Sequence, residues 1–164
     1  MTLIWEFYVD GGCRGNGHNW AIGAAAACFW HRRRRLRTRT RHLDTWRYRA
    51  TSQRAEILAV IIALEWALDK LDNTYSNADV EITIYSDSTF VVDCMESWIH
   101  GWVENGWRNS RGRRVANQDL LEVAFELNEE VQESAFLNYV WIPRDENQAA
   151  DDACNEALDE QEYD

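Results

Sequence analysis

The sequence lacks a hydrophobic run long enough to cross a membrane. Its longest apolar stretches, 24–30 and 57–64, fall far short of the ~20 residues that a spanning helix needs. The N-terminal residues lead straight into a strand-like segment, without the basic and then apolar pattern of a secretory signal or the Arg- and Ser-rich composition of a transit peptide. We therefore expect no membrane span and an intracellular location, in the cytoplasm or the nucleus.

Paired cysteines, repeats and linkers are also missing. The four cysteines are widely spaced and form no C-x-x-C pair, a pattern that favours reduced thiols over disulfides or a zinc site. The 164 residues are 46% hydrophobic and 12% aromatic, enough for one sizeable core. We expect a single domain over residues 1–160, followed by an acidic tail at 161–164.

The charge is strongly polarised along the chain. The net charge is -11, which by itself argues against a nucleic-acid partner. Residues 1–54, however, hold eleven arginines against three acids, whereas residues 55–164 hold the other 6 basic residues and 25 acids. A second basic island at 108–114 lies next to several tryptophans. Basic and aromatic residues together are what a nucleic-acid groove requires.

The periodicity of apolar residues predicts an α/β fold. Apolar β-prone runs predict strands at 3–9, 20–30, 43–49, 80–85 and 137–142, with 31–42 as an Arg-rich turn. Helical spacing and capping residues predict helices from 51 or 52 to about 71, and at 89–98, 117–130 and 148–158. Three strands in antiparallel order followed by alternating helices and strands imply a five-stranded mixed sheet flanked by helices.

Four acids sit where these elements meet. Asp10 and Asp87 end the first and fourth strands, while Glu56 and Asp151 lie in the first turns of the long helix and the last helix. Acids at strand ends share one edge of a sheet, where open α/β folds bind their ligands. Four acids packed together repel unless cations neutralise them, and a pair of Mg²⁺ ions suits phosphodiester chemistry. Taken singly, each acid is as well explained by a loop or a helix dipole.

The residues around these acids resemble type 1 ribonuclease H, in that family's order and over nearly the whole chain. The matching segments are 8–17 (YVDGGCRGNG), 51–56 (TSQRAE), 85–88 (YSDS), 98–107 (WIHGWVENGW), 115–120 (VANQDL) and 142–151 (IPRDENQAAD). The basic and aromatic segment 98–114, together with 154–158 (CNEAL), is similar to small fungal members. The resemblance implies a ribonuclease H-like fold.

By the same resemblance, the chain is an endonuclease that cuts the RNA strand of RNA–DNA hybrids. Asp10, Glu56, Asp87 and Asp151 would be the catalytic and metal-binding carboxylates, with two Mg²⁺ ions, or Mn²⁺ in their place. Water would attack the RNA phosphate, leaving 5′-phosphate and 3′-hydroxyl ends. We expect the enzyme to be a monomer.

The resemblance also assigns the contacts with each strand of the hybrid. The residues at the RNA strand, near the 2′-hydroxyls that distinguish RNA from DNA, would be Cys13, Asn16, Ser52 and Gln53. A pocket for a DNA phosphate would be formed by Arg49, Thr51 and Asn117. A channel against the DNA sugars would be lined by Phe90, Trp98 and Trp102. Ser52 stands where the family often has Asn, which weakens one expected hydrogen bond.

One departure concerns the last loop, where the family usually has a Gly-rich segment with a histidine. Here the loop is short, 143–147 (PRDEN), and holds no histidine. Since that histidine is thought to help protons move or product leave, its absence bears on turnover more than on reaction type. Arg144 is a candidate to replace it electrostatically.

Other readings of the chain stay open at this point. The first is a retroelement-type ribonuclease H domain that works beside a polymerase, and the second is a catalytically weak module that binds hybrids. Arginine also recurs at every second residue from Arg33 to Arg41, which on a strand would share one face. That face could bind phosphate or another acidic surface, could simply offset the acidic body, or could be a targeting signal.

Overall fold

The computed structural model describes residues 1–31, 35–74 and 77–162 and is built on one five-stranded sheet. The strands are β1 (Thr2–Arg14), β2 (Ile22–His31), β3 (Arg35–His42), β4 (Asp79–Ser86) and β5 (Phe136–Trp141). Their order across the sheet is β3-β2-β1-β4-β5. β1 to β3 pair antiparallel, whereas β1 pairs with β4 and β4 with β5 in parallel. The predicted mixed sheet is confirmed, with the three antiparallel strands first.

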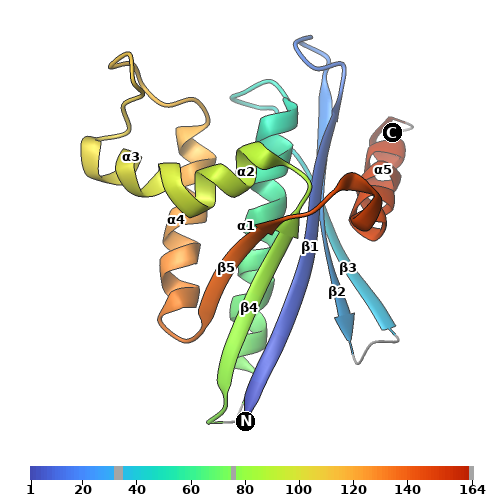
Figure 1. The fold of residues 1–164 in the computed structure, drawn as a ribbon. Coiled ribbons are helices and arrows are strands. Elements are labelled where there is room, and N and C mark those ends of the chain that lie inside the picture. Colours follow the sequence, from blue (N-terminus) through green and yellow to red (C-terminus); the bar gives the residue numbers. More distant parts are fainter. Residues whose placement is uncertain (32–34, 75–76, 163–164) are drawn as a thin grey trace.

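Helices cover both faces of this sheet (Figure 1). The helices and helical turns are α1 (Ser52–Asp72), α2 (Thr89–Asp93), the π-helical turn η1 (Cys94–Trp98), α3 (Ile99–Asn105), α4 (Gln118–Gln132), the 3-10 turn η2 (Arg144–Glu146) and α5 (Gln148–Glu162). α1 and α4 pack together on one face, and α5 packs on the other face against β1 and β2. Within the described residues, no helix is long and apolar enough to span a bilayer.

Alternation along the central strands distributes side chains between these two layers. On β1, Phe7 and Val9 are buried in the main core with α1, whereas Tyr8 packs against the smaller cluster formed with α5. β2 is covered on both faces, and its residues from Ala24 to Cys28 are completely buried. Small alanine side chains let helices approach β2 from both sides, which explains the Ala-rich run in the sequence.

The third strand was predicted in the wrong place. The segment 35–42, expected to be part of a turn, is the edge strand β3, and 43–49 lies outside any strand. The period-two alternation of arginine with Leu36, Thr38 and Thr40 suits an edge strand whose charged face is solvated. Beyond it, the Asp44 carboxylate accepts a hydrogen bond from the Trp46 backbone N–H (2.8 Å), a local turn that competes with strand pairing.

Three further boundaries differ from the prediction. The first strand does not end at Asp10 before the glycine pair, because β1 continues through it to Arg14, where it pairs with β2. The helix expected at 89–98 is α2 and η1, and it continues as α3 to Asn105, where Gly106 ends it with a left-handed φ of 77°. Residues 161–162 of the expected acidic tail continue α5, and 163–164 lie outside the described residues. So does Arg33, the first member of the predicted arginine series.

Candidate active site

Two adjacent glycines at the end of β1 allow helices to approach it closely from opposite faces. A Cβ atom at Gly11 would overlap the backbone of Ala55 and Glu56, where the first turn of α1 passes into the second. A Cβ atom at Gly12 would lie 3.3 Å from Cys154 Sγ on α5. Because α1 and α5 cover opposite faces of the sheet (Figure 1), the glycine pair brings the N-terminal halves of both helices close to the stretch of β1 that directly follows Asp10.

The four acids predicted from the sequence line one cavity of about 440 Å³. Asp10 comes from β1, Glu56 from α1, Asp87 from the end of β4, and Asp151 from α5. Cys13, Ser52 and Arg144 line the same cavity. Across residues 1–31, 35–74 and 77–162, no three His, Cys, Asp or Glu side chains already converge closely enough to hold a metal ion.

Three acids in this cavity have raised pKa values, as expected where buried negative charges are not balanced by nearby positive charge. The pKa of Asp10 is raised to about 8, mainly by burial and in addition by the charge of Asp87 and a hydrogen bond with Asp151. Burial likewise raises the pKa of Glu56 and of Asp87. The Gly11 backbone N–H donates to Asp10 Oδ1 (3.0 Å), which favours the charged form but does not outweigh the burial and repulsion.

This donor set fits divalent cations of the hard, oxygen-seeking kind. Carboxylate oxygens are the ligands that Mg²⁺ prefers, and a dication beside Asp10 would remove the repulsion that raises its pKa. All four carboxylates line the same cavity, so the oxygen ligands that such a cation needs surround one space.

Two residues that support the acids were not assigned a role from the sequence. Ser88 Oγ donates to Glu56 Oε2 (2.8 Å) and accepts from the Val91 backbone N–H (3.2 Å), so it holds Glu56 and caps α2 at once. A serine directly after a strand-ending acid and before a helix carries the signature of an N-cap, and that signal was available.

Asn147 is the second such residue, and it is 1% exposed. Its Nδ2 donates to the Val9 backbone carbonyl (2.8 Å), which ties the last loop to β1. A hydrogen bond from Asn147 also lowers the pKa of Asp87, opposing the effect of burial. Asn147 therefore fixes the start of α5, and with it Asp151, relative to β1 and β4.

Arg144 lies at the open side of the cavity. Its Nη2 is 3.8 Å from Asp151 Oδ1, and its side chain is 82% exposed. Its charge also lowers the pKa of Asp87. Arg144 is therefore the basic side chain of the last loop that reaches these acids, at the place where the histidine was expected.

The residues predicted to contact RNA gather at the start of α1. The Ser52 backbone N–H donates to Asn16 Oδ1 (3.4 Å), which joins the β1–β2 turn to the helix. Gln53 is exposed next to Ser52, and its Oε1 accepts from Asn117 Nδ2 (3.4 Å). Cys13 lies on the wall of the acid cavity. The four residues therefore form one polar rim beside the acids.

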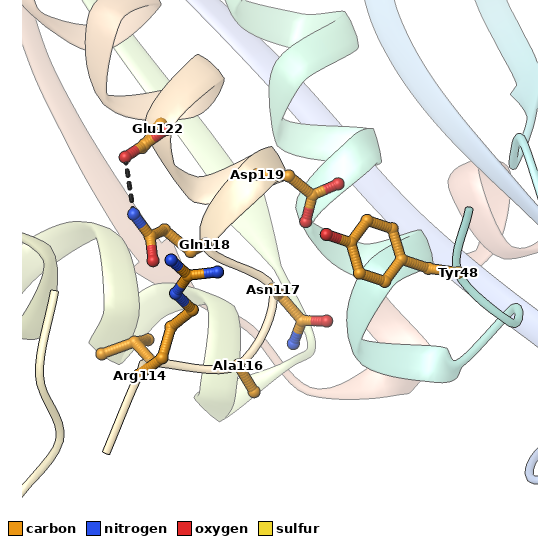
Figure 2. Close-up of a pocket in the computed structure, with 8 residues that line it drawn as sticks. Tyr48, Arg114, Ala116, Asn117, Gln118, Asp119 and Glu122 are labelled. Atoms are coloured by element: carbon orange, nitrogen blue, oxygen red, sulfur yellow. Dashed lines mark hydrogen bonds between the residues drawn. The ribbon is translucent and has the colours of Figure 1, made fainter.

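The predicted DNA-phosphate residues are only partly brought together. Asn117 lies in a pocket of about 450 Å³ between Tyr48 and Arg114, where Figure 2 shows Tyr48 facing Asn117 and Asp119. Thr51 is the N-cap of α1, and its hydroxyl accepts from the Arg54 backbone N–H (3.2 Å). Arg49 is exposed on the loop before α1 and is not part of this pocket wall.

An ion pair between a buried arginine and a more exposed aspartate supports that pocket. Arg54, 6% exposed, donates from both terminal nitrogens to the Asp119 carboxylate (2.9 and 2.8 Å). Its guanidinium also lies 4.4 Å from the Tyr48 ring centre. Arg54 thereby joins the loop before α1, α1 and α4, a role that its place in the TSQRAE segment did not reveal.

The aromatic residues predicted to line the DNA channel form a continuous row. Ring centres are 6.4 Å apart between Phe90 and Trp98, and 6.0 Å apart between Trp98 and Trp102. Trp107, which the sequence did not single out, extends the row at 6.4 Å from Trp102. Trp98 and Trp102 border a hollow of about 630 Å³.

Comparison with known proteins places the chain among ribonucleases H. The family model RNase H matches residues 4–159. Ribonuclease H of Haemophilus influenzae is 30% identical over 151 residues, covering 92% of this chain and 84% of the relative. Ribonuclease H of Dechloromonas aromatica is 30% identical over 159 residues, covering 94% and 93%.

Solved structures share the fold. LC11-RNase H1 in complex with an RNA/DNA hybrid has a TM-score of 0.67 at 23% identity, covering 96% of this chain and 98% of its own. RNase H1 from Halobacterium salinarum has a TM-score of 0.64 at 24% identity, covering 96% and 98%. The foamy viral protease-reverse transcriptase, also with a hybrid, has a TM-score of 0.70 at 17% identity over 93% of this chain and 19% of its own.

Proposed function

This chain belongs to the RNase H family, and on that premise we propose that it is an endonuclease that hydrolyses the RNA strand of RNA–DNA hybrids. The observation that carries the proposal is the single cavity lined by Asp10, Glu56, Asp87 and Asp151. The relatives at 30% identity named ribonuclease H support the same activity. The likeness to the viral polymerase chain is one of fold alone and favours no polymerase-linked role.

In the proposed mechanism, the four carboxylates would hold two Mg²⁺ ions. Bound in this way, the ions would supply an activated water and neutralise charge on the attacked phosphate and the leaving 3′-oxygen. Asp10 would lie centrally, because it is next to both Asp87 and Asp151. Ser88 would orient Glu56 through their 2.8 Å hydrogen bond. The products would carry 5′-phosphate and 3′-hydroxyl ends.

The surroundings of the cavity favour a hybrid as substrate. The polar rim of Asn16, Ser52 and Gln53 would offer amide and hydroxyl partners to the minor groove, where 2′-hydroxyls are displayed. Asn117 with Thr51 and Arg49 would hold a phosphate of the DNA strand. The aromatic row of Phe90, Trp98 and Trp102 would pack against deoxyriboses, which lack the 2′-hydroxyl and so fit an apolar surface.

Arg144 would assist turnover in place of the missing histidine. At 3.8 Å from Asp151 and 82% exposed, it can offset negative charge at the cavity mouth yet remain free to move when product leaves. Since all four acids come from one chain, we also propose that the enzyme works as a monomer, which light scattering during size-exclusion chromatography can check.

A cleavage assay with four labelled substrates tests the proposal: RNA–DNA hybrid, single-stranded RNA, double-stranded RNA and double-stranded DNA. Each is incubated with Mg²⁺, with Mn²⁺ and with EDTA. Cutting of the hybrid RNA alone, abolished by EDTA, is the expected result, and end-labelling identifies the termini. A wild-type chain that binds hybrid without cutting it would exclude the enzyme, and full activity in Asp10→Asn would exclude the site.

A further inference from the structure

An arginine strip runs along the edge of the sheet, away from the acid cavity. Arg35, Arg37, Arg39 and Arg41 alternate along β3 and are all exposed. They share one face of the strand because side chains two residues apart point the same way. Arg39 and Arg41 contact α1, so this is the face of the sheet that α1 covers. β3 is an edge strand, so nothing in the sheet lies beyond it.

Internal charge compensation explains only part of this strip. Arg39 pairs with Asp69 at 2.9 Å and Arg41 with Glu65 at 2.7 Å, and all four side chains are at least 41% exposed. Exposed pairs of this kind hold their partners weakly, so they can exchange for phosphate.

Arg35 and Arg37 form no ion pair within the part of the chain that the structure describes. Burial lowers the pKa of the Lys70 amine, which sits 4.3 Å from the Phe29 ring centre, and the nearby charge of Arg37 lowers it further. Basic groups are therefore in surplus on this edge, in a chain whose net charge is -11.

The arginine strip is continuous with the pocket that holds Asn117. After β3, a second hollow of about 300 Å³ begins at Arg41 and is also lined by Trp46, Arg47 and Tyr48. Tyr48 and Asp119 line this hollow and the Asn117 pocket of Figure 2 alike. A path on which basic and aromatic side chains outnumber the acids Asp44 and Asp119 thus leads from Asn117 to Arg35.

Exposed aromatic residues on this path point to nucleic acid rather than to an acidic protein. Trp46 is 91% exposed and Tyr48 is 48% exposed, and both alternate with Arg47 and Arg49 on the loop before α1. Arginines with interleaved aromatic rings suit a strand of phosphates and bases, because the rings stack on bases while the arginines neutralise the backbone. An acidic peptide would need the arginines but not the rings.

We propose that β3 and the loop 43–49 form an accessory track for nucleic acid, which takes up the hybrid beyond the Asn117 pocket. The inference rests on the proposed function, since it assumes that a DNA phosphate occupies that pocket. At ~3.4 Å per residue, the eight residues of β3 extend about 27 Å, which corresponds to about eight base pairs. The track would thus contribute to binding of long hybrids and leave cleavage chemistry unchanged.

The test compares hybrids of two lengths in an Asp10→Asn background, where binding can be measured without cleavage. One hybrid is just long enough to be cut, and two others are extended by about ten base pairs at one end or the other. The variant Arg35→Gln/Arg37→Gln is measured beside Arg35→Lys/Arg37→Lys, which keeps the charge. Binding constants are taken between 50 and 200 mM salt.

For one of the extended hybrids, the glutamine variant should lose about two units of the slope of log K against log salt, because each phosphate contact contributes about 0.9. Its affinity loss between 50 and 200 mM salt should therefore be about tenfold smaller than that of the parent. The short hybrid should show no change, and the lysine variant should behave like the parent.

Three outcomes would overturn the track. The first is an equal slope for the glutamine variant and the parent on every hybrid, and the second is an equal loss of slope on the short and the long hybrids. The third is binding of a polyglutamate peptide that depends on Arg35 and Arg37 while the hybrid slopes stay unchanged. Failure of the proposed function is a separate result. It would appear as no cleavage of any hybrid by the wild-type chain, whereas the binding slopes decide the track on their own.

Discussion

Replacing Asp10 by Asn should stabilise the metal-free protein while abolishing its activity. The Asp10 carboxyl is buried and faces the charges of Asp87 and Asp151, which together raise its pKa from 3.8 to about 8. A carboxyl whose pKa is higher in the folded than in the unfolded chain binds a proton more tightly when folded. The stabilisation that protonated Asp10 gives to the folded protein is therefore fully present below pH 4 and is lost as pH rises toward 8.

The size of this loss follows from the two pKa values. Between pH 4 and 8 the free energy of unfolding should fall by about 1.4 kcal/mol per pH unit through this group alone. From pH 6 to 8 the fall is at most about 3 kcal/mol, since Asp87 and Asp151 share the same repulsion. For a chain of this length that corresponds to a melting temperature about 5–10 °C lower at pH 8. Asparagine has the same shape and cannot ionise, so Asp10→Asn should lack this loss.

Thermal unfolding in EDTA at pH 6 and pH 8 measures the effect, with Asp152→Asn as a control that removes an exposed acid one residue from Asp151. Addition of Mg²⁺ at pH 8 should raise the melting temperature of the wild type and of the control, and should do little for Asp10→Asn. If wild type and Asp10→Asn lose the same stability between pH 6 and 8, the carboxylates do not repel one another as described.

Three further substitutions test how the cavity is built. Gly11→Ala should destabilise the protein by about 1–3 kcal/mol or more in urea unfolding and strongly reduce cleavage, because its Cβ would displace α1. The control Gly101→Ala, at a position with open space around it, should raise the free energy of unfolding by about 0.5–1 kcal/mol. Ser88→Ala should raise the Mg²⁺ concentration needed for half-maximal cleavage, since Glu56 loses its hydrogen bond. If the Mg²⁺ dependence of cleavage is unchanged, Ser88 only caps α2. Arg144→Ala should lower turnover several-fold with hybrid specificity retained, and unchanged turnover would remove the role proposed for Arg144.

The sheet could be predicted from periodicity except at its charged edge. A continuous apolar run such as 24–29 predicts a strand that is covered on both faces, and β2 is such a strand. β3 has no such run, because an edge strand needs only one lightly covered face and can carry an arginine at every second position. The β-prone residues of 43–49 were misleading since the Asp44 side chain forms a local turn there, and propensity alone does not detect that competition.

Asp87 directly after β4 and Asp151 in the first turn of α5 lie where the sequence placed them, whereas β1 continues beyond Asp10 and Glu56 follows the first turn of α1. The groups that hold the acids could not be located from the sequence. Asn147 acts on Val9 and Asp87, which are far away in sequence, and only the packed structure brings them together. Trp107 joins the aromatic row through a left-handed backbone (φ 64°), an unusual conformation for a tryptophan that no periodicity signals.

The glycine pair of β1 explains why the repulsion within the cavity persists instead of being relaxed. Gly11 is in contact with the backbone of α1, and Gly12 with the side chains of α5, so both helices are fixed by the two hydrophobic layers of the sheet. To separate Asp151 from Asp10, or Glu56 from Asp87, one of these helices would have to leave its layer, which exposes buried apolar surface. Protonation of Asp10 or capture of a cation relieves the repulsion without that loss. Because a carboxyl with a pKa of about 8 is mostly protonated near pH 7, a divalent cation that binds there has to displace this proton, and metal binding should therefore release protons.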